Sequence, residues 1–169
     1  MSKVLTFSRV FPSYHPRKGE PTYFVEKIYK SLYLAKVVPE ELASSFNFAV
    51  MNDESYQPKH HTIRAGHRWK VGDKFSPRVW SGKPYQSKQI IIAPDIEIKK
   101  VWDIRIHTIA HWINYSGMMF PIDYKELAKN DGLSTKDFLD WFGNPTQKGF
   151  KFHDVFFGQI ICWNENIEY

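Results

Sequence analysis

The chain has 169 residues, of which 43% are hydrophobic and 17% are aromatic. This composition excludes a disordered protein, and the length predicts one domain, residues 1–169, with its own hydrophobic core. Lysine and arginine outnumber aspartate and glutamate by 23 to 18, and the resulting net charge of +5 is compatible with a polyanionic partner.

Cysteine content and hydropathy limit the compartment in which the protein works. Cys162 is the only cysteine, so an internal disulfide is excluded and a reducing compartment is indicated. Its neighbours Ile160, Ile161 and Trp163 predict a buried, unreactive thiol. No apolar run approaches the length that spans a membrane, and the first residues lack a signal-peptide core. We therefore expect a cytoplasmic protein without membrane contact.

The N-terminal part predicts a strand, a loop and a helix. Polar and apolar residues alternate over Lys3–Val10, which indicates a strand. Three prolines and a glycine make Phe11–Pro21 a loop, in which Tyr14 and Arg17 are candidates for stacking on a base and holding a phosphate. A proline-stiffened surface connection explains the same loop. The range Thr22–Leu34 predicts a capped helix with an apolar stripe that belongs to the core.

The stretch Lys59–Gly82 combines cations, histidines, tryptophans and turn glycines. Thr62-Ile63-Arg64 predicts a strand with Ile63 inward and with Thr62 and Arg64 on an open face. A Gly-Asp turn signal at 72–73 precedes a second predicted strand, residues 75–80. We expect a strand, turn and strand unit with a basic edge.

Further strands are predicted from 89 to 121. The continuous apolar run Gln89–Pro94 is typical of a strand buried on both faces. Asp95–His107 alternates with a change of phase near Val101, which favours one strand bent by a β-bulge. The segment Thr108–Pro121 fits either a helix or a strand.

Two helices with local start and stop signals follow. Asp123 and Glu126 resemble a capping box, and Gly132 is suited to end that helix. Ser134 is a second N-cap, for a helix that Gly143 ends. Residues 155–163 predict a closing strand. Strands with helices between them indicate an α+β fold, a small mixed β-barrel flanked by helices.

Three motifs resemble the ASCH domain, a small β-barrel family related to the PUA fold of RNA-modifying proteins. They are Lys59-x-x-Thr62-Ile63-Arg64, Val71-Gly72-Asp73 and Trp80-x-Gly82. The segment 126–133 leading into 138–142 is similar to a helical part of that family. The resemblance covers roughly half of the chain and implies a PUA-like barrel. Relative to the family pattern, residues 36–58 form an insertion, in which a short helix from Pro39 and a strand at 48–51 are predicted.

The first functional hypothesis is a basic, aromatic cleft that binds nucleic acid. From Lys59 to Lys100 there are ten basic residues and three acids, interleaved with aromatic side chains. Cations suit phosphates and flat rings suit unstacked bases, so RNA, a modified nucleoside or single-stranded DNA are the expected partners. The candidate binding residues are Arg64, His67, Arg68, Trp69, Lys70 and Trp80, with Tyr14 and Arg17 from the N-terminal loop. Two alternatives explain the same pattern. The lysines are solvated and the tryptophans belong to the core, or the chain is a non-catalytic interaction module that binds an acidic protein.

The second hypothesis is an enzyme. Within the ASCH superfamily, amidohydrolases that deacetylate N4-acetylcytidine use a lysine, a threonine and a distant acid. Lys59 and Thr62 match the first two positions, and Asp131 falls at the third, where the family has the longer glutamate. In such a trio the lysine takes the threonine proton, and the carboxylate acts on the leaving amine or on the lysine. A surface lysine, a β-forming threonine and a solvent-facing aspartate are the alternatives.

Neither a cofactor nor a metal is expected. Asp103, His107 and His111 are spaced by four and would share one face of a helix. The alternation of polar and apolar residues before His107 indicates a strand, however, to which the helical spacing does not apply.

Overall fold

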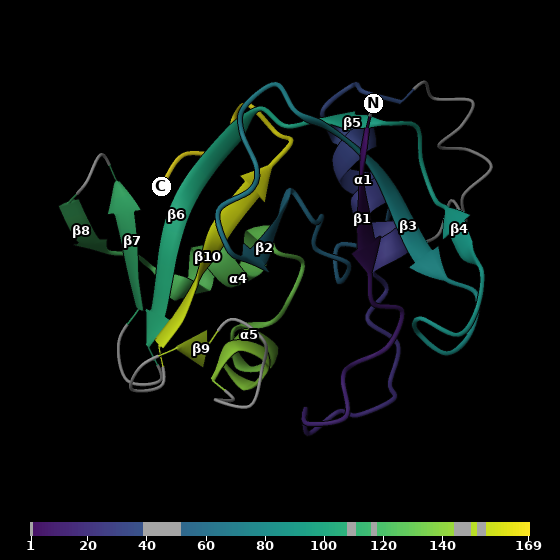
Figure 1. Ribbon diagram of the computed structural model, residues 1–169, viewed down its shortest axis with the longest axis horizontal. Coiled ribbons are helices and arrows are strands. Elements are labelled where there is room, and N and C mark those ends of the chain that lie inside the picture. Colours follow the sequence, from purple (N-terminus) through teal and green to yellow (C-terminus); the bar gives the residue numbers. More distant parts are fainter. Residues whose placement is uncertain (1, 39–51, 108–110, 116–117, 144–149, 152–154) are drawn as a thin grey trace.

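The computed structural model describes residues 2–38, 52–107, 111–115, 118–143, 150–151 and 155–169. In this part of the chain three helices accompany two β-sheets, so the fold is mixed α+β (Figure 1). None of the described helices has the length and apolarity needed to cross a bilayer.

The first sheet is built on β3. Its members are β1 (Lys3–Phe7), β3 (Lys74–Trp80), β4 (Gln89–Ile91) and β5 (Ile96–Glu97). The order is β1-β3-β4, with β5 also paired to β3. β1 runs parallel to β3, and β4 and β5 run antiparallel to it. Alternation of polar and apolar residues directs Leu5 and Phe7 of β1 into the core.

The second sheet is antiparallel throughout and is built on β10. Its members are β2 (His61–Ala65), β6 (Lys100–His107), β7 (His111–Tyr115), β8 (Met118–Pro121), β9 (Phe150–Lys151) and β10 (Val155–Cys162). The order is β2-β10-β6-β7-β8, with β9 also paired to β10. Of the segment Thr108–Pro121, for which the sequence fits either a helix or a strand, residues 111–115 and 118–121 are strands, so the helical interpretation is wrong there.

The two sheets meet at a corner formed by residues 98–99. The amide of Ile98 donates to the carbonyl of Asp73 in the first sheet's turn, and the amide of Lys99 donates to Cys162 in the second sheet. Figure 1 shows the sheets diverging from this corner. At the opposite side Arg64 of β2 donates from Nη2 to the carbonyl of Thr6 in β1 at 2.7 Å. Within the described residues no strand ladder joins β1 to β2, so the sheets do not close into a barrel.

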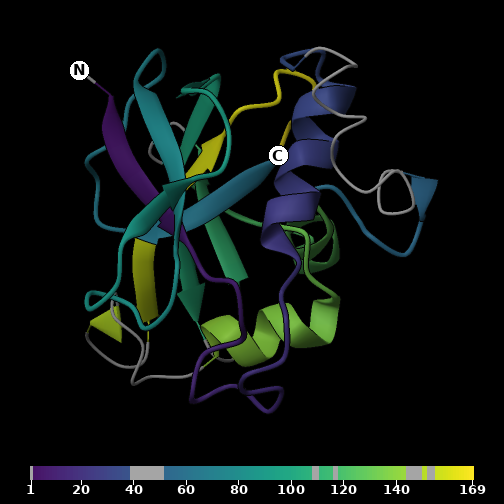
Figure 2. The ribbon, with the colours of Figure 1, turned by 90° about the vertical axis from the view of Figure 1, so that its right-hand side faces the viewer.

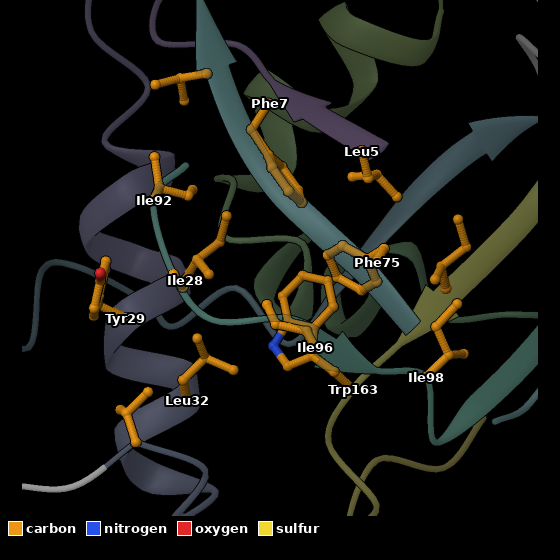
Figure 3. Packing of buried hydrophobic residues seen from close by; sticks show 14 of the residues in the cluster. Leu5, Phe7, Ile28, Tyr29, Leu32, Phe75, Ile92, Ile96, Ile98 and Trp163 are labelled. Carbon is orange, nitrogen blue, oxygen red and sulfur yellow. The ribbon is translucent and has the colours of Figure 1, made fainter. Parts of the chain in front are cut away.

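The helices cover two hydrophobic clusters. α1 (Phe24–Leu34) stands beside the strands (Figure 2). Its residues Ile28 and Leu32 pack with Phe75 and Trp163 (Figure 3). The second cluster contains Leu127 of α4 (Tyr124–Asn130), Phe138 of α5 (Thr135–Phe142) and Ile63 of β2. Burial of these side chains from both sheets holds the layers together.

The predicted N-cap residues and terminal glycines of the second and third helices, α4 and α5, are confirmed. Asp123 caps α4 by accepting from the Lys125 amide at 2.9 Å, and Gly132 follows the helix with a φ of +72°. Ser134 caps α5 by accepting from the Asp137 amide at 3.0 Å, and Gly143 ends this helix. For α1 the structure differs slightly, because Tyr23 with a φ of 56° is the N-cap residue, although Thr22 Oγ1 accepts from the Phe24 amide.

Predicted pairings around the central stretch are wrong. β2 and β3 form at the predicted places, but β2 pairs with β10 and β3 with β1, so they lie in different sheets. The reason is the segment between them, which buries Trp69 in the core and carries the chain from one sheet to the other. The predicted open face of Thr62 and Arg64 is also wrong. This face of β2 is directed at the first sheet, because Arg64 reaches Thr6 and its guanidinium carbon lies 5.3 Å from the centre of the Phe7 ring.

Two further strand predictions are corrected. Residues 95–107 form two strands, β5 and β6, because the backbone bonds of residues 98–99 move the chain to the other sheet where a bulge was expected. β4 is not buried on both faces, since Ile90 and Ile91 are 48% and 61% exposed on a strand that is paired on one side. The predicted helix from Pro39 and strand 48–51 lie outside the described residues, as does most of the predicted insertion at 36–58.

Candidate functional site

A buried pair, Lys59 and Asp131, lies where α1, α4 and β2 meet. The amide of Lys59 donates to the carbonyl of Lys27 in α1, and the amide of His60 donates to Asn130 at the end of α4. These bonds place the Lys59 side chain against the C-terminus of α4. Lys59 Nζ donates to Asp131 Oδ1 at 2.5 Å and to the Asp131 carbonyl at 2.8 Å. Lys59 is 1% exposed and Asp131 is 4% exposed.

Burial dominates the electrostatics of this pair. Loss of solvent lowers the pKa of Lys59 to about 8, although the Asp131 carboxylate opposes the change. Burial likewise raises the pKa of Asp131 above its ordinary value, against the opposing effect of Lys59. The Phe24 ring, whose centre lies 4.2 Å from Lys59 Nζ, covers the ammonium group. A lysine whose pKa is near 8 holds a usable neutral fraction close to neutral pH.

Two more cations, both on partly buried residues, act electrostatically on the same carboxylate. Lys27 Nζ donates to the Gly132 carbonyl at 2.6 Å, and Arg64 acts electrostatically on Asp131. Burial lowers the pKa of Lys27, and it lowers the pKa of Arg64 to about 10. We call Lys27, Lys59, Arg64 and Asp131 the buried charge cluster; it contains three cations and one acid. Among the described residues the Nε of Arg64 is buried without a hydrogen-bond partner.

His61 joins this cluster and was not singled out as a site residue from the sequence. Its Nε2 lies 3.2 Å from the Leu127 carbonyl, and its Nδ1 lies 3.7 Å from Asp131 Oδ1. Burial and the Lys59 charge hold the pKa of His61 well below 6.5, so the ring is neutral. Nε2 therefore donates to Leu127, and Nδ1 remains a buried acceptor that no described group satisfies.

The three candidate catalytic residues are only partly brought together. Lys59 and Asp131 are in direct contact. Thr62 is buried on β2 between Lys59 and Arg64 along the chain. In the described part of the chain its hydroxyl makes no hydrogen bond to Lys59 or Asp131. A reaction at this site requires these groups to approach each other when a substrate binds.

The candidate binding residues that follow β2 have different environments. Arg68 and Lys70 are exposed, and the Arg68 guanidinium carbon lies 5.1 Å from the centre of the Trp69 ring. His67 is half exposed, with Nδ1 at 2.9 Å from Asp103 Oδ1. Trp69 is only 2% exposed and packs on Phe75, so its assignment to base stacking is wrong; it is a core residue.

Trp80 lines a surface hollow of about 310 Å³. The other lining residues are Phe7, Ser8, Arg9, Val10, Pro21, Ser81, Gly82 and Pro84. A neighbouring hollow of about 330 Å³ shares Arg9 and Pro21 and includes Phe24. Phe7, which lines the first hollow, contacts the Arg64 guanidinium. Phe24, which lines the second hollow, contacts the Lys59 ammonium group. Each hollow is therefore in contact with the buried charge cluster through one phenylalanine.

Tyr14 and Arg17 lie in a loop that is attached to α5. His15 Nε2 lies 3.1 Å from the Asp137 carbonyl. Arg17 donates to Asp137 Oδ2 at 2.8 Å and to Glu20 Oε2 at 2.7 Å, so two carboxylates already balance its charge. Burial raises the pKa of Tyr14 to about 12. These contacts favour the structural interpretation of the loop.

The metal hypothesis can be compared with the described residues. They contain no group of three or more His, Cys, Asp or Glu side chains that could hold a metal ion. Asp103 lies in β6 and His111 begins β7, so the helical spacing considered for a metal does not apply. Cys162 is buried, as predicted, and burial raises the pKa of its thiol to about 11.

In comparisons with known proteins, no family model, no curated protein and no solved structure matched this chain.

Proposed function

We propose that this protein is a PUA-like ASCH domain protein that binds RNA or a modified nucleoside. The observation that carries the proposal is the buried charge cluster, in which three cations act on one carboxylate and the Nε of Arg64 is unsatisfied. The PUA-like interpretation is supported by two sheets that share the corner at 98–99 and approach again where Arg64 meets Thr6.

The energetics of the cluster favour an anionic or strongly polar ligand. A buried donor without a partner costs about 1–3 kcal/mol, and an uncompensated buried charge costs more. A ligand that accepts from Arg64 Nε would remove both penalties. Guanidinium groups suit phosphate oxygens because their donors form a planar fork. The aromatic hollow beside Phe7 provides a place for a base next to such a contact.

The binding proposal predicts a selective loss of affinity in Arg64→Lys. This variant keeps a positive charge but lacks the Nε donor and the fork, so we expect affinity for a short single-stranded RNA to fall at least about tenfold. Fluorescence anisotropy with a labelled octamer measures this change. Thermal unfolding monitors whether the variant keeps its fold, since Arg64 also holds β1 through Thr6.

Lys136→Ala is the matched control, because Lys136 is an exposed cation on α5 that pairs with Asp140. Its affinity should stay within about twofold of the wild type. An absence of RNA binding by the wild-type protein, or equal losses in the two variants, contradicts the proposal.

A second candidate function is amide hydrolysis of an N-acylated nucleoside such as N4-acetylcytidine. The favouring observation is Lys59, whose pKa of about 8 and contact with Asp131 suit a general base. Neutral Lys59 would take the proton of the Thr62 hydroxyl as its oxygen attacks the acyl carbon. The protonated lysine, directly or by way of Asp131, would pass that proton to the leaving amine as the carbon–nitrogen bond breaks. Water would then release the acyl group from Thr62, and the threonine would regain its proton.

This second function predicts release of acetate and cytidine from N4-acetylcytidine. Thr62→Val, which keeps the side-chain shape without the hydroxyl, should abolish the release, and Thr62→Ser should retain part of it. Because the base must be neutral, the rate should rise about tenfold per pH unit below the lysine pKa and level off above a pH of about 8. Chromatography of the products over pH 6–10 checks both. An intact substrate, or a rate that does not change across this range, counts against the reaction.

A further inference from the structure

We propose that Trp80, Tyr85 and Arg9 form a docking site for one unstacked base of a single-stranded RNA, beside the buried charge cluster. The inference rests on the proposed function and adds a second point of contact to it. Trp80 closes β3 and lines the hollow of about 310 Å³ with Arg9 and Phe7. The Tyr85 ring lies 5.3 Å from the Trp80 ring, inclined by 49°.

The loop after β3 holds Tyr85 out into solvent. Tyr85 is 90% exposed and has a φ of +64°, a conformation that non-glycine residues adopt at a cost. The loop is ordered by its own hydrogen bonds: Ser81 donates to the Lys88 carbonyl at 2.9 Å, and Gly82 donates to Ser87 Oγ at 3.0 Å. Burial does not explain an aromatic side chain in this position. A stacking ligand does, because a base would cover the ring and gain about 1–3 kcal/mol.

The charges around the hollow select a polyanion. Arg9 lines the hollow, and Lys83 and Lys88 are exposed cations of the adjacent loop. None of the residues that line the hollow is acidic, and Glu26 belongs to the neighbouring hollow. The backbone phosphates on either side of a docked base would therefore meet cations.

The hollow is also placed to act together with Arg64. Phe7 lines the hollow and contacts the Arg64 guanidinium. One strand can thus stack a base on the exposed Tyr85 ring, next to Trp80, and direct an adjacent phosphate or base edge toward Arg64. The hollow's volume is within the usual range for small-ligand sites, roughly 300–1,000 Å³.

The test is anisotropy with a labelled uridine octamer and three tyrosine variants. Tyr85→Ala should weaken binding about 5- to 150-fold, as expected for one lost stacking contact. Tyr85→Phe should stay within about twofold, since the ring is retained. Tyr33→Ala is the control, because Tyr33 is an exposed tyrosine on α1 that belongs neither to the lining of the hollow nor to the Trp80–Tyr85 ring pair. An abasic octamer should bind the wild type and Tyr85→Ala with equal, weak affinity.

The outcomes separate this inference from the proposed function. RNA binding that Arg64→Lys weakens and Tyr85→Ala leaves unchanged would overturn the docking site alone. Failure of the wild type to bind any octamer would overturn both. Displacement of the octamer by polyglutamate at equal charge concentration would assign the surface to an acidic protein partner. That result would also overturn the base-docking site. Equal binding of a thymidine octamer supports base docking without a sugar preference.

Discussion

At the residue scale, the feature that most needs explanation is a lysine that is buried at the end of α4. A buried ion pair is weakly stabilising as a pair, but loss of one partner leaves an uncompensated charge. Lys59 keeps its charge because the carboxylate and carbonyl of Asp131 both accept from it. Removal of either partner would therefore leave the other charge buried without compensation.

The substitution Asp131→Asn tests this view. We expect the free energy of unfolding to fall by about 3–5 kcal/mol at pH 7, because the Lys59 ammonium loses its counterion. The pKa of Lys59 is lower in the folded than in the unfolded chain, so stability rises as the pH increases from the folded value toward the unfolded one. The loss should therefore shrink at about pH 9.5. Urea unfolding at both pH values measures it.

Asp140→Asn is the matched control, since Asp140 forms a surface pair with Lys136. Its cost should stay below about 1 kcal/mol. If the two substitutions lower the free energy of unfolding equally, the Lys59–Asp131 pair does not hold a buried charge that needs its counterion.

The candidate site could be predicted in part from single residues. The sequence pointed to Lys59 and Thr62 through their spacing and to Asp131 through its position before a glycine. Two of these residues, Lys59 and Asp131, are in contact. The burial of Lys59 could not be predicted, because it depends on α1 and α4 approaching β2. Lys27 and His61 could not be assigned for the same reason, since neither carries a local signal.

At the element scale, local signals predicted the helices and non-local pairing decided the sheets. α4 and α5 begin and end at the predicted residues because a cap is a contact within one turn. The partners of β2 and β3 are far away in the sequence, and alternation of side chains gives no information on which strand lies alongside. The phase change near Val101 was visible, but a bulge and a change of sheet produce the same pattern.

The β2–β10 contact gives an element-scale prediction. A Cβ at Gly158 would lie 2.2 Å from the Arg64 carbonyl oxygen, which is backbone and cannot move away easily. Gly158→Ala should therefore lower the free energy of unfolding by about 2 kcal/mol or more and displace Arg64. Denaturant unfolding and octamer binding should both be affected.

Gly82→Ala provides the comparison, because a Cβ there meets only Ser87 at an ordinary 3.6 Å. Its unfolding free energy should change by less than about 0.5 kcal/mol. If Gly158→Ala is equally mild, the two strands are not as closely packed as described.

At the scale of the whole molecule, the two sheets share a corner and leave their other edges apart. Arg64, a member of the buried charge cluster, donates from β2 to Thr6 in β1, and Phe7 in β1 contacts Arg64 and lines the Trp80 hollow. The general α+β architecture could be predicted from the order of strands and helices. Incomplete closure could not, because it depends on where β1 and β2 lie relative to each other.

The central claim is that this junction binds a nucleic acid strand through cations and an aromatic hollow. The most direct measurement is the salt dependence of the affinity for a uridine octamer. If Arg9, Arg64, Lys83 and Lys88 each neutralise a phosphate, the logarithm of the affinity should fall with the logarithm of salt concentration with a slope of about −3. Binding that does not change with salt, or no binding at low salt, would contradict the account.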